Sequence, residues 1–338
     1  MTRHYSDYMK TKNTLILMLC IVFIVSYDTN SYGQYSVDRN IHMGDPFVLL
    51  DNGAYYLYGT TGGAGFKAWK STNLMNWEPL RNVFTRTEKS WGNSSFWAPE
   101  VCSYRGKYYM TYSASGINEK GKFKLCLAIS DRPEGPFTDI KTPWLEFSDW
   151  SCIDASLFID NDSVPYLFFD KVGVIEDPWH LFGIIYMVRL TEDLMTAETA
   201  PELVAQADQQ WEEMDPKYKS SCNEGAFVFR SNNKYYLTYS SGHYLSQKYG
   251  IGYSTADSPF GPWTKSPDNT LVKTDIEKGI SGPGHNSITW SPDRKIMYLV
   301  YHGHADPDQS GGDRQVFIDK IIIDDNGSLK IIRQVGNE

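Results

Sequence analysis

The sequence predicts an all-β protein, a five-bladed β-propeller with four antiparallel strands in each blade. Three observations lead to this fold class: a plan that recurs five times along the chain, tight-turn residues in the middle of each repeat, and an aromatic-rich strand after each turn. No segment shows the apolar period of a helix. Recurrence of a multi-strand unit is typical of radial folds, in which ring closure leaves only short sheet edges.

Each repeat reads as a polar or acidic start, an apolar strand, a turn and a second strand rich in tyrosine or phenylalanine. The repeats start at residues 45, 98, 154, 224 and 285, and each interval has room for four short strands. The central turns contain the residues that tight hairpins favour, namely Asn52-Gly53, Arg105-Gly106, Asn161-Asp162, Asn232-Asn233 and Pro292-Asp293. Each repeat therefore predicts a hairpin.

A third strand follows the hairpin in three repeats, at residues 66–77, 125–137 and 252–263, and ends in a polar corner and an aromatic residue. The third interval is the longest, and its segments Val172–Phe182 and Ala205–Ser221 are predicted to be loops over one face. A β-sandwich is the alternative for a chain of short strands, but sandwiches seldom repeat a whole four-strand unit.

The N-terminus has the order of a secretory signal. A basic start is followed by the apolar run Leu15–Val25 and then by small residues that end at Gly33. The run is too short to span a bilayer comfortably. We expect a signal peptide over residues 1–33, a single propeller domain over residues 34–338, and a secreted or periplasmic location without membrane attachment.

Composition excludes some functions. Lys and Arg number 32 against 41 Asp and Glu, which gives a net charge of −9 and no basic footprint for nucleic acid. The four cysteines after residue 33 are too few for a disulfide scaffold and lack zinc-site spacing. Cys152 and Cys222 each precede an acidic residue by two positions, and a disulfide between them is a hypothesis. We expect a monomer or a weak oligomer.

The opening residues of the repeats are candidates for a site. In a propeller the first strand of each blade lines the central axis, so these residues converge at one end of the ring; they are Asp45, Glu100, Asp154, Glu224 and His285. Carboxyl groups and an imidazole that meet in one funnel shift each other's pKa values. Each acid alone is explained as a turn former or an exposed loop residue, but their recurrence in equivalent places favours a site.

Six motifs occur in order along the chain, namely His42-Met-Gly-Asp-Pro-Phe-Val48, Trp97-Ala-Pro-Glu-Val101, Ile153-Asp-Ala-Ser-Leu157, Asn223-Glu-Gly-Ala-Phe227, Gly282-Pro-Gly-His-Asn-Ser287 and Asp313-Arg-Gln-Val-Phe-Ile-Asp319. With these motifs the sequence resembles the five-bladed propellers of glycoside hydrolase family 43 over nearly all of the mature chain. The Trp-Met-Asn-Asp-Pro-Asn start expected of the sister invertase-type propellers is absent.

The resemblance implies that Asp45 is a general base, Glu224 a general acid, and Asp154 the residue that tunes the pKa of the acid and holds it in place. An inverting hydrolysis needs one ionised carboxylate to activate water and one protonated carboxyl group for the leaving oxygen. Like-charge repulsion from Asp154 is expected to keep Glu224 protonated near neutral pH.

Other residues are assigned to substrate or metal. Arg314 matches the arginine of the family's closing motif and is expected to bind sugar hydroxyls near the acid, with a surface ion pair as the alternative. The expected pocket wall consists of Phe96, Trp97, His243 and Tyr244, with His302 and His304 at the rim. His285 is expected on the axis, where some family members bind calcium or another ion; a hydrogen-bonded core histidine is the alternative.

The function implied by the resemblance is a secreted inverting glycosidase that releases a terminal pentose from plant cell-wall polysaccharide or oligosaccharide. α-L-Arabinofuranosidase ranks first and β-xylosidase second, with no cofactor required for the chemistry. Endo-arabinanase is a further alternative. A propeller that binds glycans without cleaving them is the alternative from another class.

Overall fold

The predicted hairpin turns have the backbone geometry that tight turns require. Strands β2 (Gly44–Asp51) and β3 (Ala54–Thr60) are joined by Asn52 and Gly53, whose φ angles are 48° and 80°. Positive φ at both central residues is the signature of the two-residue turn that matches strand twist. Asn232 and Asn233 repeat this geometry with φ angles of 48° and 60°. Local turn chemistry therefore sets the pairing of these strands.

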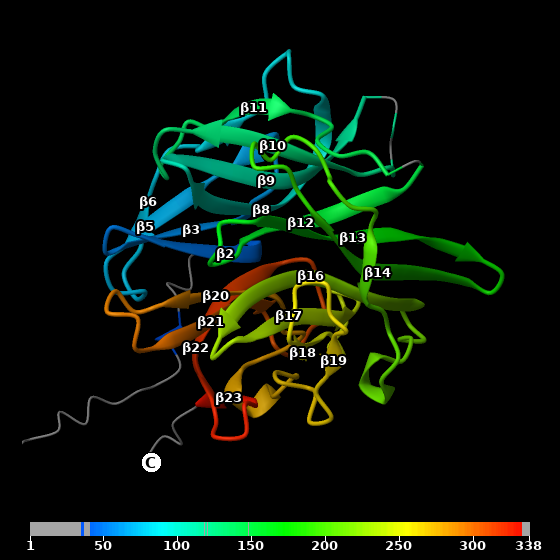
Figure 1. Ribbon diagram of the computed structural model, residues 1–338. Coiled ribbons are helices and arrows are strands. Elements are labelled where there is room, and N and C mark those ends of the chain that lie inside the picture. The colour runs from blue at the N-terminus through cyan, green and yellow to red at the C-terminus, as the bar shows by residue number, and fades with distance from the viewer. Residues whose placement is uncertain (1–34, 37–40, 118, 120, 148, 333–338) are drawn as a thin grey trace, which may run out of the picture. The chain divides into compact units, whose positions relative to one another are not determined.

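The computed structural model describes residues 35–36, 41–117, 119, 121–147 and 149–332 (Figure 1). Strands dominate this part of the chain, and its only helical elements are two 3-10 turns, at Gln210–Glu212 and Ile276–Lys278. None of the described helical segments is long and apolar enough to cross a membrane. The predicted signal peptide over residues 1–33 lies outside the described residues.

The strands follow one another in groups of four along the chain. The first group is β2, β3, β5 (Ala68–Ser71) and β6 (Glu78–Pro79); the second is β8 (Gly92–Tyr104), β9 (Lys107–Gly116), β10 (Lys124–Ser130) and β11 (Thr138–Lys141). The third is β12 (Ser151–Ile159), β13 (Pro165–Glu176), β14 (Trp179–Arg189) and β15 (Glu202–Ala205); the fourth is β16 (Ser220–Ser231), β17 (Lys234–Gly242), β18 (Gly250–Ala256) and β19 (Thr264–Lys265). The last contains β20 (Gly284–Trp290), β21 (Met297–His304) and β22 (Arg314–Ile323), with β1 (Tyr35–Ser36) and β23 (Leu329–Ile332) both paired to β22. A separate pair joins β4 (Gly65–Phe66) to β7 (Phe84–Thr85).

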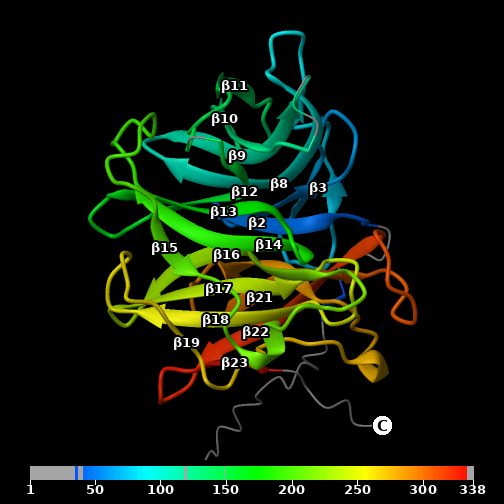
Figure 2. The ribbon, with the colours of Figure 1, turned by 90° about the vertical axis from the view of Figure 1, so that its right-hand side faces the viewer.

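The first strands of the groups, β2, β8, β12, β16 and β20, contact one another in a closed cycle, with β2 against both β8 and β20 (Figures 1 and 2). The fold is therefore an all-β propeller with antiparallel pairing inside each group, as predicted. One parallel contact, between β14 and β16, merges the third and fourth groups into an eight-stranded sheet. The cycle is the arrangement that a five-bladed propeller requires; the blade count itself stays a prediction.

Each first strand carries a β-bulge near its beginning, and the bulge starts with a residue in the left-handed region. These residues are Asp45, Ala98, Asp154, Gly225 and His285, with φ angles between 46° and 62°. Four of the five are not glycine, and such backbone strain is concentrated at functional sites. The sequence comparison of repeats aligned Glu224 with Asp45, and this alignment is wrong by one position, because Gly225 occupies the equivalent place.

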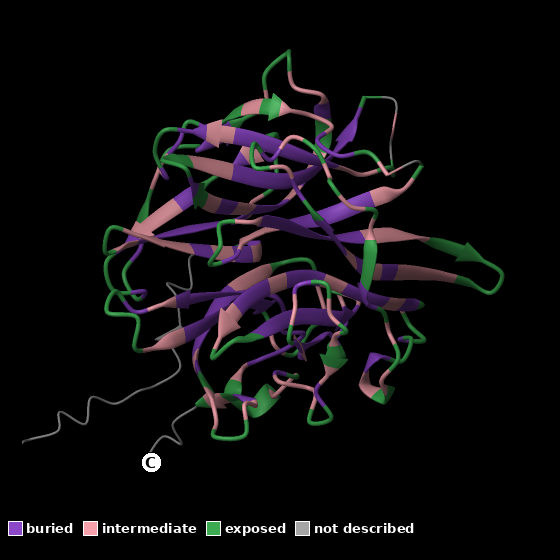
Figure 3. Ribbon diagram, in the orientation of Figure 1, coloured by how far each residue is buried: buried purple, intermediate pink, exposed green. Residues whose placement is uncertain are grey.

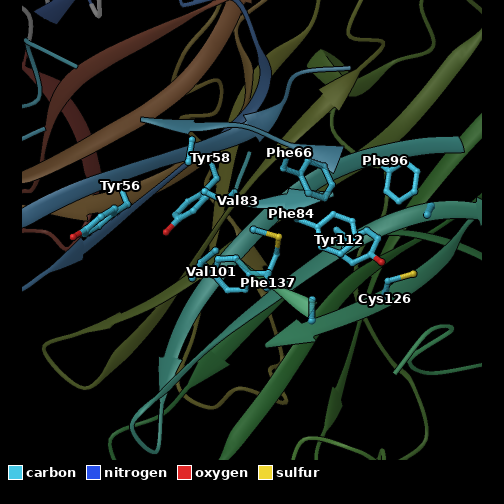
Figure 4. Packing of buried hydrophobic residues seen from close by; sticks show 14 residues of the cluster. Tyr56, Tyr58, Phe66, Val83, Phe84, Phe96, Val101, Tyr112, Cys126 and Phe137 are labelled. Atoms are coloured by element: carbon cyan, nitrogen blue, oxygen red, sulfur yellow. The ribbon is translucent and has the colours of Figure 1, made fainter. Parts of the chain in front are cut away.

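Aromatic side chains fill the space between neighbouring sheets. Phe66, Phe84, Phe96 and Tyr112 form the centre of one such cluster between the first and second groups (Figure 4). The Phe96 ring lies 6.3 Å from Phe66 and 6.0 Å from Tyr112, measured between centroids, and the residue is 2% exposed. The prediction that Phe96 forms part of the pocket wall is therefore wrong, because its ring belongs to this core.

Two further expectations need correction. Residues 172–182 are not a loop: they extend β13 and β14 into a long hairpin that projects from the body (Figure 1). Residues 205–221 are mostly loop, as predicted.

Cys152 and Cys222 are both buried free thiols, so the hypothesis of a disulfide between them is not supported. In the sheet, strands β13 and β14 lie between the two strands that carry them.

Candidate active site

A cavity of about 350 Å³ opens near the N-terminal ends of the first strands. Asp45, Asp154, Glu224 and His285 all line it, although they lie far apart in the sequence. Four of the other predicted substrate-binding residues line the same cavity, namely Trp97, His243, Tyr244 and Arg314. Its volume lies in the range of small-ligand pockets. The propeller thus brings the predicted acidic residues together at one place.

Asp45 is held by cations and hydrogen-bond donors. Arg314 donates from Nη1 to Oδ1 over 3.0 Å, and the Thr60 hydroxyl donates to Oδ2 over 2.5 Å. His285 Nδ1 and His302 Nδ1 lie 3.4 and 3.6 Å from Oδ1. Burial alone would raise the pKa of Asp45, but Arg314, His285 and Thr60 together hold that pKa far below its usual range. The carboxylate is therefore ionised at any ordinary pH.

Arg314 reaches Asp45 because glycine stands next to that acid. A Cβ atom on Gly44 would lie 2.1 Å from the Arg314 guanidinium carbon, so any other residue there would displace the guanidinium. The Arg314 guanidinium also lies over the Tyr244 ring, with its central carbon 4.9 Å from the ring centroid. Arg314 was expected near the acid Glu224; its ion pair is instead with Asp45.

Glu224 has a different environment. The Tyr249 hydroxyl donates to its Oε1 over 2.7 Å, and the Tyr249 ring occupies the space above Gly284, where a Cβ atom would lie 1.8 Å from the ring. Burial, and after it the charge of Asp154, raise the pKa of Glu224 to about 7, while the Tyr249 hydrogen bond lowers it. The repulsion from Asp154 expected from the sequence is present, but burial is the larger cause.

Three side chains act on the charge of Asp154. Burial and the charge of Asp45 raise its pKa above the usual value, although His285 and a hydrogen bond from the Asp170 side chain lower it. Asp170 is fully buried on β13, and its Oδ2 accepts the backbone N–H of Gly225 over 2.8 Å. The Asp154 carboxyl group therefore contacts a second carboxyl group directly behind the cavity.

His285 lies between the acids. Its Nδ1 is 3.4 Å from Asp45 and 3.7 Å from Asp154. Burial lowers the pKa of His285, but these carboxylates, with Glu224 and Glu100, raise it above its usual value overall. Burial also raises the pKa of Glu100 to about 8. Within the described part of the chain, no group of three or more His, Cys, Asp or Glu side chains is arranged to hold a metal. The calcium ion expected near His285 stays a prediction.

The remaining predicted residues divide between the wall and the layer behind it. The Trp97 ring packs on Phe123 at 4.6 Å, and the His243 ring stacks on Tyr244 at 5.0 Å. His302 is fully buried and does not line the cavity; its Nδ1 accepts the Asp45 backbone N–H over 3.1 Å. The expectation that His302 contacts substrate at the rim is therefore wrong.

Buried His304 is also behind the wall, with its Nε2 2.9 Å from the Tyr244 carbonyl oxygen. Sequence reasoning missed Thr60, Tyr249 and Asp170. Asp170 ends the apolar segment Tyr166–Phe169, and an acid in that place is a usable signal for a buried functional carboxyl group. Nothing in the pattern around Thr60 or Tyr249 separates them from strand residues.

Within the cavity, the carboxylate of Asp45 is ionised, and the carboxyl group of Glu224 keeps its proton up to about pH 7. Such a pair, in a cavity that closes off part of the solvent, has the charge states that general base and general acid catalysis require.

Comparisons with known proteins agree with this chemistry. The family model described as glycosyl hydrolases family 43 matches residues 40–329. A crystal structure of a thermostable family-43 glycoside hydrolase is 40% identical, with a TM-score of 0.80, and the match covers 89% of this chain and 95% of that one.

Two curated relatives are more distant. The beta-D-galactofuranosidase xynD of Aspergillus niger is 26% identical over 303 residues, 84% of this chain and 81% of the relative. Xylosidase/arabinosidase 43A of Humicola insolens is 28% identical over 200 residues, 52% of this chain and 58% of the relative. Since the family model covers most of the chain, the protein belongs to glycosyl hydrolases family 43, an inverting family of glycoside hydrolases.

Proposed function

We propose that the protein releases a terminal pentose from plant cell-wall glycans by inversion, with Asp45 as general base and Glu224 as general acid. The observation that carries the proposal is that two carboxyl groups line one cavity in opposite surroundings. Arg314 and Thr60 bind Asp45 and keep its pKa far below the usual range, whereas burial and Asp154 raise the pKa of Glu224 to about 7. Two carboxyl groups with such different pKa values supply both protonation states at one pH.

In the proposed reaction, Asp45 takes a proton from a water molecule as the water oxygen attacks the anomeric carbon. Glu224 gives its proton to the glycosidic oxygen as the bond from that oxygen to the anomeric carbon breaks. The new hydroxyl group lies on the face opposite to the leaving group, so the anomeric configuration inverts. Afterwards Asp45 loses its extra proton to solvent and Glu224 regains one.

The pH dependence follows from the same groups. Glu224 must be protonated, and its pKa is about 7, so activity is expected to fall as pH rises through about 7. Asp45 must be ionised, and since its pKa lies far below the usual range it does not limit activity under mildly acidic conditions. Asp154 assists by raising the pKa of Glu224.

For the sugar, we rank α-L-arabinofuranose first and β-D-xylose second. The small cavity with the aromatic residues Trp97 and Tyr244 in its wall is suited to a single sugar ring. One relative is named a xylosidase/arabinosidase and another a β-D-galactofuranosidase, so the substrate panel includes a galactofuranoside. We also propose that the predicted signal peptide over residues 1–33 directs secretion of the protein.

The test compares Asp45→Asn and Glu224→Gln with the unmodified protein on nitrophenyl α-L-arabinofuranoside, β-D-xyloside and β-D-galactofuranoside. We expect each substitution to lower kcat by about 10²-fold or more. Glu78→Gln, at an exposed acid on β6, is the control and keeps full activity. Proton NMR of the first product is expected to show the inverted anomer. Absence of sugar release from these glycosides, arabinan and arabinoxylan would favour a glycan-binding protein without catalysis.

A further inference from the structure

The hairpin formed by the outer parts of β13 and β14 is an arm with apolar residues in solvent. Its paired residues run from Val172 opposite Gly183 to Glu176 opposite Trp179. Near the tip, Val174, Ile175 and Trp179 are 41%, 42% and 45% exposed. The exposed end of the arm projects beyond the body of the protein (Figures 1 and 3). An exposed apolar segment on a soluble protein usually marks a binding surface.

One face of the arm is continuous with the cavity. Directly paired residues share a face, and alternate residues along a strand share it too. Val172, Val174, Leu181 and Trp179 therefore lie on one face, and the first three of them line the cavity. From Val172 to the pair that contains Trp179, the face extends about 13 Å at the usual rise per residue. We call these four residues the arm face.

The base of the arm is fixed to the strand that carries Glu224. Leu181 donates its backbone N–H to the Lys219 carbonyl oxygen over 2.8 Å, and residues 181–183 pair in parallel with residues 220–222 of β16. Phe182, on the opposite face, covers Gly173 and also borders the cavity. The arm face is therefore held in a defined position relative to the acid.

We propose that the arm face binds the glycan chain beyond the scissile bond, with the Trp179 ring stacked on a sugar ring of that chain. The inference rests on the proposed function and deepens it: the preferred substrate is a polysaccharide or a long oligosaccharide. A cavity for one terminal sugar leaves the rest of the chain to emerge beside Val174 and Leu181. Sugar rings present apolar faces that stack on indole rings, and the arm face offers such a surface along the exit path.

The test measures kcat/KM of the Trp179→Ala variant on two substrates. On a nitrophenyl pentoside, which has no sugar beyond the scissile bond, the value stays within about twofold of the unmodified protein. On debranched arabinan or a long xylo-oligosaccharide, whichever the unmodified protein cleaves, it falls about five- to tenfold, mainly through KM. Ile175→Ala is the matched control, because Ile175 is equally exposed but lies on the opposite face; it leaves both values unchanged.

Equal values for Trp179→Ala and the unmodified protein on the polymer would overturn the inference, and so would equal losses on both substrates. Failure of the proposed function looks different, because the unmodified protein would then release no sugar at all. In that case retardation in native gels that contain arabinan or arabinoxylan still tests the arm face. If the Trp179→Ala variant loses the retardation, the inference that the arm face binds glycan is supported. If retardation is absent, or is unchanged in the variant, the inference is overturned. A dimer that Trp179→Ala converts to a monomer without change in polymer cleavage would identify a self-association surface instead.

Discussion

The side chains of Asp154 and Asp170 are hydrogen-bonded to each other, and Asp170 Oδ2 also accepts the backbone N–H of Gly225 over 2.8 Å. Two carboxyl groups can share a hydrogen bond only if one of them holds a proton. Burial, and next to it the charge of Asp154, raise the pKa of Asp170 well above its usual range. The pKa of Asp154 is raised less than that of Asp170, so Asp170 holds the shared proton and Asp154 carries the charge that acts on Glu224.

Two substitutions of Asp170 test whether its proton supports the charge of Asp154. Asp170→Asn retains a donor for Asp154 and an acceptor for Gly225, so we expect kcat/KM to stay within about threefold and its alkaline pH limit to remain unchanged. Asp170→Leu has the same shape without the donor. Asp154 then becomes harder to ionise, its repulsion on Glu224 weakens, and the alkaline limit moves to lower pH by about half a unit or more. The measurement is kcat/KM between pH 5 and pH 9 on a nitrophenyl glycoside.

The Asp170→Asn variant distinguishes a protonated Asp170 from an ionised one. If Asp170 were ionised in the working enzyme, Asp170→Asn would remove a charge near Glu224 and would itself shift the alkaline limit downward. A purely structural role would lower the activity of the Leu variant at every pH and leave the limit of both variants where it is in the unmodified protein.

Tyr249 is expected to act on Glu224 in the opposite direction to Asp154. Its hydroxyl donates to Glu224 Oε1 over 2.7 Å, and this hydrogen bond lowers the pKa of the acid. In Tyr249→Phe the ionised form loses that support, so the pKa of Glu224 rises and the alkaline limit of kcat/KM moves above about 7, by about half a unit to one unit. Tyr218→Phe serves as the control, because the Tyr218 ring stacks on the wall residue His243 and its hydroxyl donates to Ser310, away from Glu224. A downward shift in Tyr249→Phe would contradict this assignment of the hydrogen bond.

Arg314 keeps Asp45 ionised by lowering its pKa. Burial opposes ionisation of Asp45, and Arg314 is the largest of the groups that lower its pKa. In Arg314→Met that pKa rises, so kcat/KM acquires a decline on the acidic side that the unmodified protein lacks at the same pH. Arg314→Lys keeps the positive charge without the planar fork; it lowers kcat but moves the acidic decline less. A profile measured from pH 3 to pH 7 distinguishes the variants, and identical acidic limits in all three proteins would refute the role.

The sequence alone predicts much of this architecture because its strongest signals are local. Asn52-Gly53 and Asn232-Asn233 specify turns through the backbone conformations that these residues tolerate, and the turns specify the hairpins. The placement of Asp45, Asp154 and Glu224 in one cavity follows from the motifs around them. The one-residue offset of Glu224 could not be predicted, since it depends on which residue of each strand starts the bulge.

The missed features are products of tertiary packing. Phe96 directly precedes the motif that begins with Trp97, but strand alternation sends the Phe96 ring into the core and the Trp97 ring to the cavity. Asp170 and Tyr249 acquire their significance from Asp154 and Glu224, with which they share no local pattern. The sequence does not distinguish the arm from a loop, because Asp177 and Pro178, which form its turn, are also typical loop residues.

Behind the acid lies a buried ion pair that is expected to stabilise the fourth strand group. Lys265 Nζ lies 2.6 and 2.8 Å from the two carboxylate oxygens of Glu212, and it donates to Asn223 Oδ1 over 2.9 Å, one residue before Glu224. The Glu212 side chain is 0% exposed and that of Lys265 is 10% exposed. Removal of the cation alone would leave a buried charge without its partner, which is the costly way to break such a pair.

We therefore expect Lys265→Met to lower the free energy of unfolding by about 3–5 kcal/mol, measured by urea denaturation. The double variant Lys265→Met/Glu212→Gln is expected to recover part of that loss, because the uncompensated charge has gone while the Tyr239 hydroxyl still has an acceptor at position 212. Lys330→Met, in an exposed ion pair with Asp268, leaves the urea midpoint unchanged. A double variant less stable than Lys265→Met would show that the Glu212 carboxylate stabilises this region through its other hydrogen bonds, to the backbone N–H groups of Asp208 and Gln209, more than through Lys265.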